Sequence, residues 1–145
     1  MTEDESSEFV PSPEKIKEIL KNSKTVAIVG LSDDRTKPSN RVGKYLKLKG
    51  YRIIPVNPKF DRVIGLKSYP SLLEIPDEVD IVDIFRKSES VGEIVDEAIK
   101  KNVKVVWMQE GVINKDAAKK AKEAGIAVVM NRCMYKEYDK HFMRN

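Results

Sequence analysis

Cysteine, histidine and long apolar runs are all scarce in this sequence. Its 145 residues include one cysteine, Cys133, and one histidine, His141. A single cysteine excludes an internal disulfide, and these two residues alone cannot supply the ligands of a structural zinc site. No apolar run approaches the roughly 20 residues of a membrane-spanning helix. The acidic, polar start from Met1 to Ser7 lacks the features of a signal or transit peptide. We therefore expect a soluble, intracellular (cytoplasmic) protein without a membrane partner.

A strong excess of one charge is also missing. The sequence has 27 Lys and Arg against 23 Asp and Glu, a net charge of +4, and the two signs are mixed along the chain. A nucleic-acid-binding protein would concentrate its basic residues on one element, so we expect no nucleic-acid partner. A looser group of cations falls in or beside expected loops, which suits a small polyanion: Arg35, Lys37, Arg41, Lys59 and Arg62. Abundant Lys and Glu with a single glutamine indicate a thermophilic source.

Apolar, β-branched runs alternate with helical patterns along most of the chain. Such runs occupy residues 26–29, 51–56, 79–85, 103–108 and 126–130, and helical spacing occupies 13–21, 42–48, 91–101, 115–124 and 135–141. Runs without polar alternation are typical of strands buried on both faces of a parallel sheet. The length suits one domain. We predict an α/β fold, a Rossmann-like doubly wound five-stranded parallel sheet in a single domain of residues 12–145, after a flexible tail of residues 1–11.

Local signals support these boundaries. Ser12 before Pro13 and Asn114 before the helical segment 115–124 are predicted N-caps, and Ser90 with Glu93 forms a predicted capping box. Asn102 is predicted to end the helical segment 91–101. A short segment at 63–66 and one helical turn at 71–74 fill the connection after the second strand. Asp80 and Asp83 do not fall on one strand face, so we expect a cap or an ion pair there and not an acid–base pair.

The first strand and the loop after it predict a ligand site. Val26-Ala-Ile-Val29 ends at Gly30, and a polar loop leads to the next helix. Free N–H groups at a helix start favour phosphate, and ligands of such sheets gather at the carboxyl ends of the strands. The nicotinamide fingerprint G-x-G-x-x-G is incomplete, because Ser32 and Arg35 occupy the later glycine positions. Lys59, and no acid, follows the second strand. The P-loop pattern is also missing.

Segments at the ends of the predicted strands resemble a known family. They are Val29-Gly-Leu-Ser32 with the loop to Ser39, Pro55-Val-Asn-Pro-Lys59, Asp83-Ile-Phe-Arg86, Trp107-Met-Gln-Glu-Gly111 and Asn131-Arg-Cys133. Together they resemble the single-domain CoA-binding proteins, which are similar to the N-terminal CoA-binding domain of the succinyl-CoA synthetase α subunit. The resemblance covers roughly residues 12–140. It implies coenzyme A as the cofactor, and CoA or acyl-CoA as the partner.

The resemblance also implies which residues bind CoA. The turn that approaches the diphosphate corresponds to Gly30, Leu31, Ser32 and Asp33, and the loop and helix start beside it to Arg35, Ser39, Arg41 and Val42. Lys59 matches a lysine that helps to bind CoA in the synthetase, in a loop shaped by Asn57 and Pro58. Nucleotide contacts correspond to Phe85 and Arg86, and the side that lines the pantetheine to Met108, Gln109 and Glu110.

Departures from the synthetase argue against catalysis by this chain. The synthetase uses a phosphorylated histidine in a second domain, whereas His141 matches nothing catalytic and no second domain is expected. We therefore expect binding of CoA or acyl-CoA without turnover. Two enzyme alternatives stay open: an NADP-dependent oxidoreductase, with Lys59 and Arg62 on the 2′-phosphate, and a subunit of an acyl-CoA synthetase. A third alternative is a regulatory protein that senses a nucleotide.

Two residues near the predicted site have competing interpretations. Cys133 follows the fifth strand on the same edge, where it could meet the CoA thiol and form a mixed disulfide with it. The other interpretation of Cys133 is a small, buried, apolar residue. Trp107 is expected to pack within the fold and not to stack on the adenine base.

Overall fold

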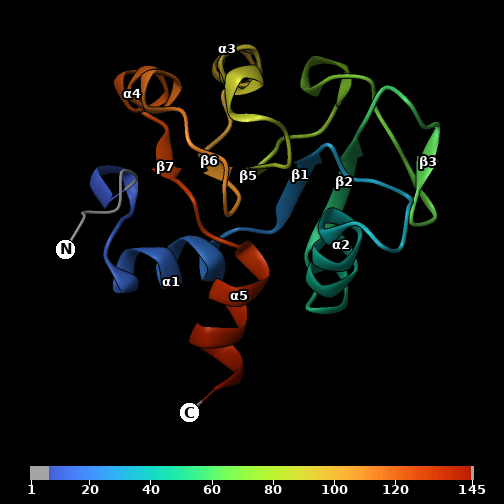
Figure 1. The fold of residues 1–145 in the computed structure, drawn as a ribbon, viewed down its shortest axis with the longest axis horizontal. Coiled ribbons are helices and arrows are strands. Elements are labelled where there is room, and N and C mark those ends of the chain that lie inside the picture. The colour runs from blue at the N-terminus through green and yellow to red at the C-terminus, as the bar shows by residue number, and fades with distance from the viewer. Residues whose placement is uncertain (1–6, 145) are drawn as a thin grey trace.

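The computed structural model describes residues 7–144, and its centre is one parallel sheet (Figure 1). The strands are β1 (Thr25–Val29), β2 (Arg52–Val56), β5 (Ile81–Ile84), β6 (Val105–Met108) and β7 (Ala127–Val129). They are ordered β2-β1-β5-β6-β7, and all neighbours are parallel. The predicted five-stranded, Rossmann-like sheet is therefore confirmed, and each strand lies within or overlaps its predicted run.

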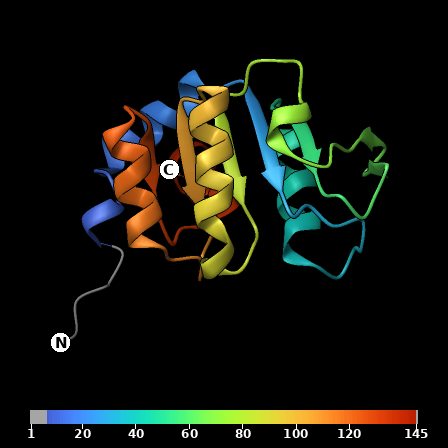
Figure 2. The same ribbon diagram turned by 90° about the horizontal axis from the view of Figure 1, so that it is seen from above.

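Helices cover both faces of the sheet. One face carries α1 (Pro13–Asn22), α2 (Pro38–Leu48) and α5 (Met134–Tyr138), which continues as a π-helical turn at Asp139–Met143. The other face carries α3 (Val91–Lys101) and α4 (Lys115–Glu123), as Figures 1 and 2 show. Two separate apolar clusters fill the two layers. Because both faces of each strand are buried, the sequence of each strand is a nearly unbroken apolar run.

Most of the predicted helix ends are confirmed. The Ser12 hydroxyl accepts the N–H of Lys15 at 3.2 Å, and Asn114 Oδ1 accepts that of Ala117 at 3.0 Å. Asn102 ends α3 in the left-handed region, with φ 62°. The capping box is wrong, because Ser90 has helical backbone angles and its side chain caps nothing. A 3₁₀ turn at Ser88–Ser90 leads straight into α3 and removes the need for a cap.

The connection after β2 is more ordered than predicted. It contains a two-stranded antiparallel hairpin, β3 (Arg62–Val63) with β4 (Leu66–Lys67). Ile64 and Gly65 form its turn with φ values of 46° and 76°, the left-handed pair that a tight hairpin needs. The predicted helical turn follows as a 3₁₀ turn at Leu72–Glu74. No helix in the described residues is long and apolar enough to span a bilayer.

The segment predicted as a flexible tail divides into two parts. Residues 1–6 lie outside the described part of the chain. Residues Ser7–Phe9 form a 3₁₀ turn, and the Phe9 ring is 3% exposed in the cluster under α3 and α4. The carbonyl oxygen of Phe9 also accepts the N–H of Met130, next to β7, at 3.2 Å. Phe9 therefore belongs to the packed domain.

Candidate functional site

A cavity of about 910 Å³ opens at the carboxyl ends of β1, β5 and β6. The chain passes from β1 through α2 to β2 on one side, and from β5 through α3 to β6 on the other side, so these two connections part between β1 and β5. Open α/β sheets bind ligands at such a point. The volume lies within the range of roughly 300–1,000 Å³ that is typical of small-molecule and cofactor sites. The sheet topology thus positions a ligand-sized hollow at the predicted edge.

The charge of this cavity is mostly positive. Five basic residues line it, Lys37, Arg41, Arg86, Lys87 and Lys136, against one carboxylate, Glu110. Glu110 pairs with Lys136 at 2.8 Å. Within residues 7–144, the side chains of Arg41, Arg86 and Lys87 make no hydrogen bond or ion pair. The cavity therefore offers three uncompensated cations to an anionic ligand.

Backbone hydrogen bonds fix the rim of the cavity. The N–H of Gly30 donates to Val56 O and that of Phe85 to Val29 O, both at 2.8 Å. Gly30 has φ +89°, and a Cβ there would collide with the carbonyl oxygen of Phe85. Only glycine fits this close approach of two strand ends. The turn after β1 and the end of β5 are thus held side by side.

The cavity brings together nine of the residues that the sequence singled out. These are Gly30, Ser39, Arg41, Val42, Phe85, Arg86, Gln109, Glu110 and Cys133. They come from the turn after β1, the first turns of α2, the ends of β5 and β6, and the loop after β7. Cys133 is a half-buried, free cysteine that lines the cavity. Trp107 is fully buried in the fold, as predicted.

The other eight residues lie outside this cavity. Leu31 and Met108 are fully buried core residues. The Ser32 N–H donates to the Ser39 hydroxyl at 3.0 Å, and Asp33 Oδ1 accepts the N–H of Ile64 at 2.9 Å, so both organise the loop after β1. The remaining four are Arg35, Asn57, Pro58 and Lys59. Arg35, Pro58 and Lys59 are exposed, and Asn57 is buried.

Six residues line the cavity without having been assigned to the site. They are Lys37, Pro38, Lys87, Val112, Tyr135 and Lys136. Pro38 carried a usable signal, because proline at the first helical position marks the start of α2. Tyr135 and Lys136 lie on α5, and Tyr135 stacks on Tyr45 of α2 with ring centroids 3.8 Å apart. This contact joins segments 90 residues apart, which local patterns do not reveal.

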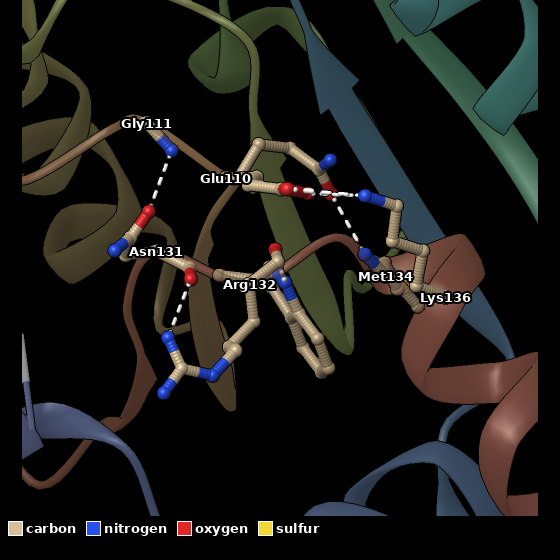
Figure 3. A network of polar contacts seen from close by, with 8 residues as sticks. Glu110, Gly111, Asn131, Arg132, Met134 and Lys136 are labelled. Carbon is tan, nitrogen blue, oxygen red and sulfur yellow. Dashed lines mark hydrogen bonds and ion pairs between the residues drawn. The ribbon is translucent and has the colours of Figure 1, made fainter.

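A polar network holds the inner wall of the cavity together (Figure 3). Lys136 Nζ lies 2.8 Å from Glu110 Oε1, and this hydrogen bond is the main cause that raises the pKa of Lys136. The Gly111 N–H donates to Asn131 Oδ1 at 2.6 Å, which ties the loops after β6 and β7 together. The N–H of Met134 donates to Gln109 Oε1 at 3.0 Å. The start of α5 is therefore fixed to the end of β6.

A second, smaller cavity of about 300 Å³ lies beside the first. Its lining includes Pro58, Leu72, Arg86, Ile94 and Glu97. Arg86 is thus common to both hollows. Glu97 is already engaged, since its Oε1 accepts the N–H of Leu72 at 3.0 Å. Glu93 also lines this cavity, so its lining combines apolar side chains with two carboxylates and the Arg86 guanidinium.

Asn57 stabilises the two loops beside these cavities. It is 5% exposed; its Nδ2 donates to Leu31 O at 3.1 Å, and its Oδ1 accepts the N–H of Lys59 at 3.0 Å. Replacing Asn57 by alanine leaves the Leu31 carbonyl unpaired, and we expect a loss of about 2 kcal/mol in the free energy of unfolding. Urea denaturation measures this loss in the free energy of unfolding. The matched control is Lys59→Ala, which keeps its backbone N–H, and equal losses in both variants would contradict this role.

Asp83 is a buried carboxyl beneath the site. It is fully buried in β5, between Ile28 of β1 and Trp107 of β6. Neither of its oxygens has a hydrogen-bond partner among the described residues, so the expected cap or ion pair is wrong for Asp83. Burial raises its pKa well above the ordinary value. Asp80, by contrast, accepts the N–H groups of Lys24 and Thr25 and pairs with Lys104, as expected of a salt-bridged residue.

The described residues hold no cluster of His, Cys, Asp or Glu suited to a metal ion.

Comparisons with known proteins agree with this geometry. Residues 24–139 match the family model of a CoA binding domain. The uncharacterized protein YneT of Bacillus subtilis is 43% identical over 124 residues, which cover 86% of this chain and 92% of YneT. The structure of a hypothetical protein from Pyrococcus horikoshii has a TM-score of 0.89 and 44% identity, and the match covers 97% of this chain and 96% of that one.

A larger enzyme shares part of the chain. The ADP-forming acetate–CoA ligase II of Archaeoglobus fulgidus is 41% identical over 83 residues, which are 56% of this chain but 12% of the ligase. The chain therefore matches small proteins over most of their length, and only a short part of this ligase.

Proposed function

This chain belongs to the family of CoA-binding domains, and on that premise we propose that it binds coenzyme A or an acyl-CoA at the carboxyl ends of its strands, without turning it over. The observation that carries the proposal is the set of uncompensated cations, Arg41, Arg86 and Lys87, around a cavity of about 910 Å³. CoA presents phosphate groups, and charge-assisted hydrogen bonds from arginine and lysine are the strong contacts for phosphate.

The two neighbouring cavities suggest how the ligand lies. Arg86 lines both, so we place the diphosphate beside it, next to the turn after β1 that begins at Gly30. The base then occupies the smaller cavity near Pro58. The pantetheine arm runs through the larger one toward Cys133, where Gln109 and Glu110 line the wall.

The direct test is calorimetry with the wild-type chain and the Arg86→Ala variant. Because a hydrogen bond to a charged group contributes about 1.5–3 kcal/mol, we expect the variant to bind CoA about tenfold to a hundredfold more weakly. Arg52→Ala is the matched control, since Arg52 lies at the opposite end of β2 and pairs with Asp77. Its affinity for CoA should equal that of the wild type. A wild-type chain that gives no heat with CoA but binds NADP would overturn the proposal.

The enzyme alternatives receive less support. Lys59 and Arg62, the expected partners of an NADP 2′-phosphate, do not line the cavity, and Arg62 donates to Gly65 O at 2.7 Å. Ligase activity belongs to proteins of which this chain matches a small share. Participation in a synthetase complex would require partner domains that supply the catalytic groups.

A further inference from the structure

The lining of the larger cavity includes a thiol. Cys133 lines the cavity directly before α5, and Tyr135 and Lys136 line the same wall. The backbone behind it is fixed, because Trp107 Nε1 donates to the carbonyl oxygen of Arg132 at 2.8 Å. The sulfur therefore lies on a wall held in place by the buried sheet.

A buried amide donor without a partner lies beside this thiol. Gln109 lines the same cavity and is 4% exposed. The N–H of Met134 donates to Gln109 Oε1 at 3.0 Å, and this bond identifies the oxygen, since an N–H requires an acceptor. The Nε2 amide group is then a donor, and no described residue accepts from it. Nε2 is not among the unpaired atoms that are sealed from solvent, and Gln109 lines the cavity. Its free N–H groups can therefore donate to an acceptor on a ligand there.

A positive charge lies close to the same sulfur. The hydrogen bond to Glu110 is the main cause that raises the pKa of Lys136, and Cys133 adds a smaller electrostatic contribution. Lys136 and Cys133 also line the same cavity, at the start of α5. Figure 3 shows the Lys136 side chain extended toward Glu110. The thiol, the amide donor and the ammonium group thus line one cavity.

We propose that Cys133 accepts the acyl group of a bound acyl-CoA by thioester exchange, with the Gln109 Nε2–H group donating to the thioester carbonyl oxygen. This inference rests on the proposed function. A thioester fits better than the free thiol of CoA, because a carbonyl oxygen accepts the Gln109 donor, whereas sulfur is a weak acceptor. Donors placed at a developing oxyanion accelerate acyl transfer.

The exchange needs no oxidant and no metal. Cys133 gives its proton to water, and its thiolate attacks the carbonyl carbon of the acyl group. The new bond joins this carbon to Sγ, the bond from the carbon to the CoA sulfur breaks, and the CoA thiolate takes up a proton from water. One thioester replaces another, so the acylated fraction follows the ratio of acyl-CoA to free CoA. Each chain takes up one acyl group, so the acylated fraction of the protein would report the ratio of acyl-CoA to free CoA.

The test is intact-protein mass spectrometry of the full chain after incubation with acetyl-CoA. A phosphine reductant is present throughout to exclude disulfides, and acid quenching removes bound nucleotide. We expect a mass increase of one acetyl group that excess CoA reverses and neutral hydroxylamine removes, and that is missing from Cys133→Ala. An acetyl group that resists hydroxylamine would be an amide on a lysine, and would contradict the proposal.

The matched variant is Gln109→Glu. It keeps an oxygen that accepts the Met134 N–H and replaces the donor by a second, negatively charged acceptor, so acetylation should slow roughly a hundredfold while the melting temperature shows that the fold is retained. Acetylation at the wild-type rate would refute the role of Gln109. Calorimetry of the wild-type chain with CoA separates the two proposals. CoA binding without any acetyl adduct refutes thioester exchange alone, whereas no binding of CoA refutes the proposed function.

Discussion

Replacing Asp83 by asparagine should make the protein more stable at neutral pH, with the gain growing as the pH rises. The Asp83 carboxyl is fully buried in β5 without a hydrogen-bond partner in residues 7–144, and burial raises its pKa well above the ordinary value. In the unfolded chain the same carboxyl loses its proton near its ordinary pKa. Asparagine has nearly the same shape, and it carries no charge in either state.

The direction of this pH dependence follows from the number of protons that the folded and unfolded states bind. Above the ordinary pKa of the carboxyl, the folded chain keeps the proton that the unfolded chain has lost. The wild-type free energy of unfolding therefore falls by about 1.4 kcal/mol for each pH unit, up to the raised pKa of the folded state. Asp83→Asn removes this slope. Asp83→Leu also removes the unpaired polar group, which adds about 1–3 kcal/mol.

Urea denaturation at several pH values measures both variants. The opposite case in the same chain is Asp80. Burial raises its pKa, but the N–H groups of Lys24 and Thr25 and the Lys104 ammonium outweigh this effect and lower it. Asp80→Asn should therefore lose stability above the ordinary carboxyl pKa, where Asp83→Asn gains it. A wild-type stability that Asp83→Asn leaves unchanged at every pH would show that the Asp83 carboxyl has the same pKa in the folded and unfolded chains.

Replacing Gly30 by alanine should cost at least about 3 kcal/mol of stability and abolish tight binding of CoA. Gly30 has φ +89°, and the added Cβ would meet the carbonyl oxygen of Phe85 closer than packed atoms allow. It would also lie 3.4 Å from Arg86 Nε. Relief requires the turn after β1 and the end of β5 to separate, which moves Arg86 away from the proposed diphosphate.

Gly50 provides the comparison that isolates the collision. It also has a positive φ, +101°, but nothing lies within 4 Å of a Cβ built there. Gly50→Ala thus carries the backbone strain alone, about 1–2 kcal/mol, and should bind CoA as the wild type does. Thermal unfolding of both variants measures the loss of stability, and calorimetry measures their affinity for CoA. Equal losses of stability would show that the turn after β1 absorbs the collision without separating from β5.

The sheet was predictable because its strands are buried on both faces. Unbroken apolar runs such as Val26–Val29 point to parallel strands, and Ser12, Asn102 and Asn114 mark helix ends through local chemistry. The hairpin at Arg62–Lys67 escaped prediction since each of its strands has two residues. The capping box at Ser90 failed because a 3₁₀ turn before α3 changed its backbone.

The site was predictable in part, for a physical reason. The rule that ligands meet the carboxyl ends of strands selects the correct edge of the sheet, and it includes Gly30, Arg86 and Gln109. It does not say which side chains of each loop face the hollow. Lys87, adjacent to Arg86, lines the cavity, whereas Lys59 does not. The wall formed by α5 depends on packing against α2, and that packing follows from the tertiary structure alone.

The position of α5 has a consequence for the newly made protein. Cys133, Tyr135 and Lys136 complete the cavity only when α5 docks on α2, through the stacking of Tyr135 on Tyr45. The sheet and four of its helices can form earlier during synthesis, but the hollow they leave lacks one wall. A chain in which α5 has not yet docked on α2 would accordingly lack this wall, and the proposed CoA site would be complete only after that docking step.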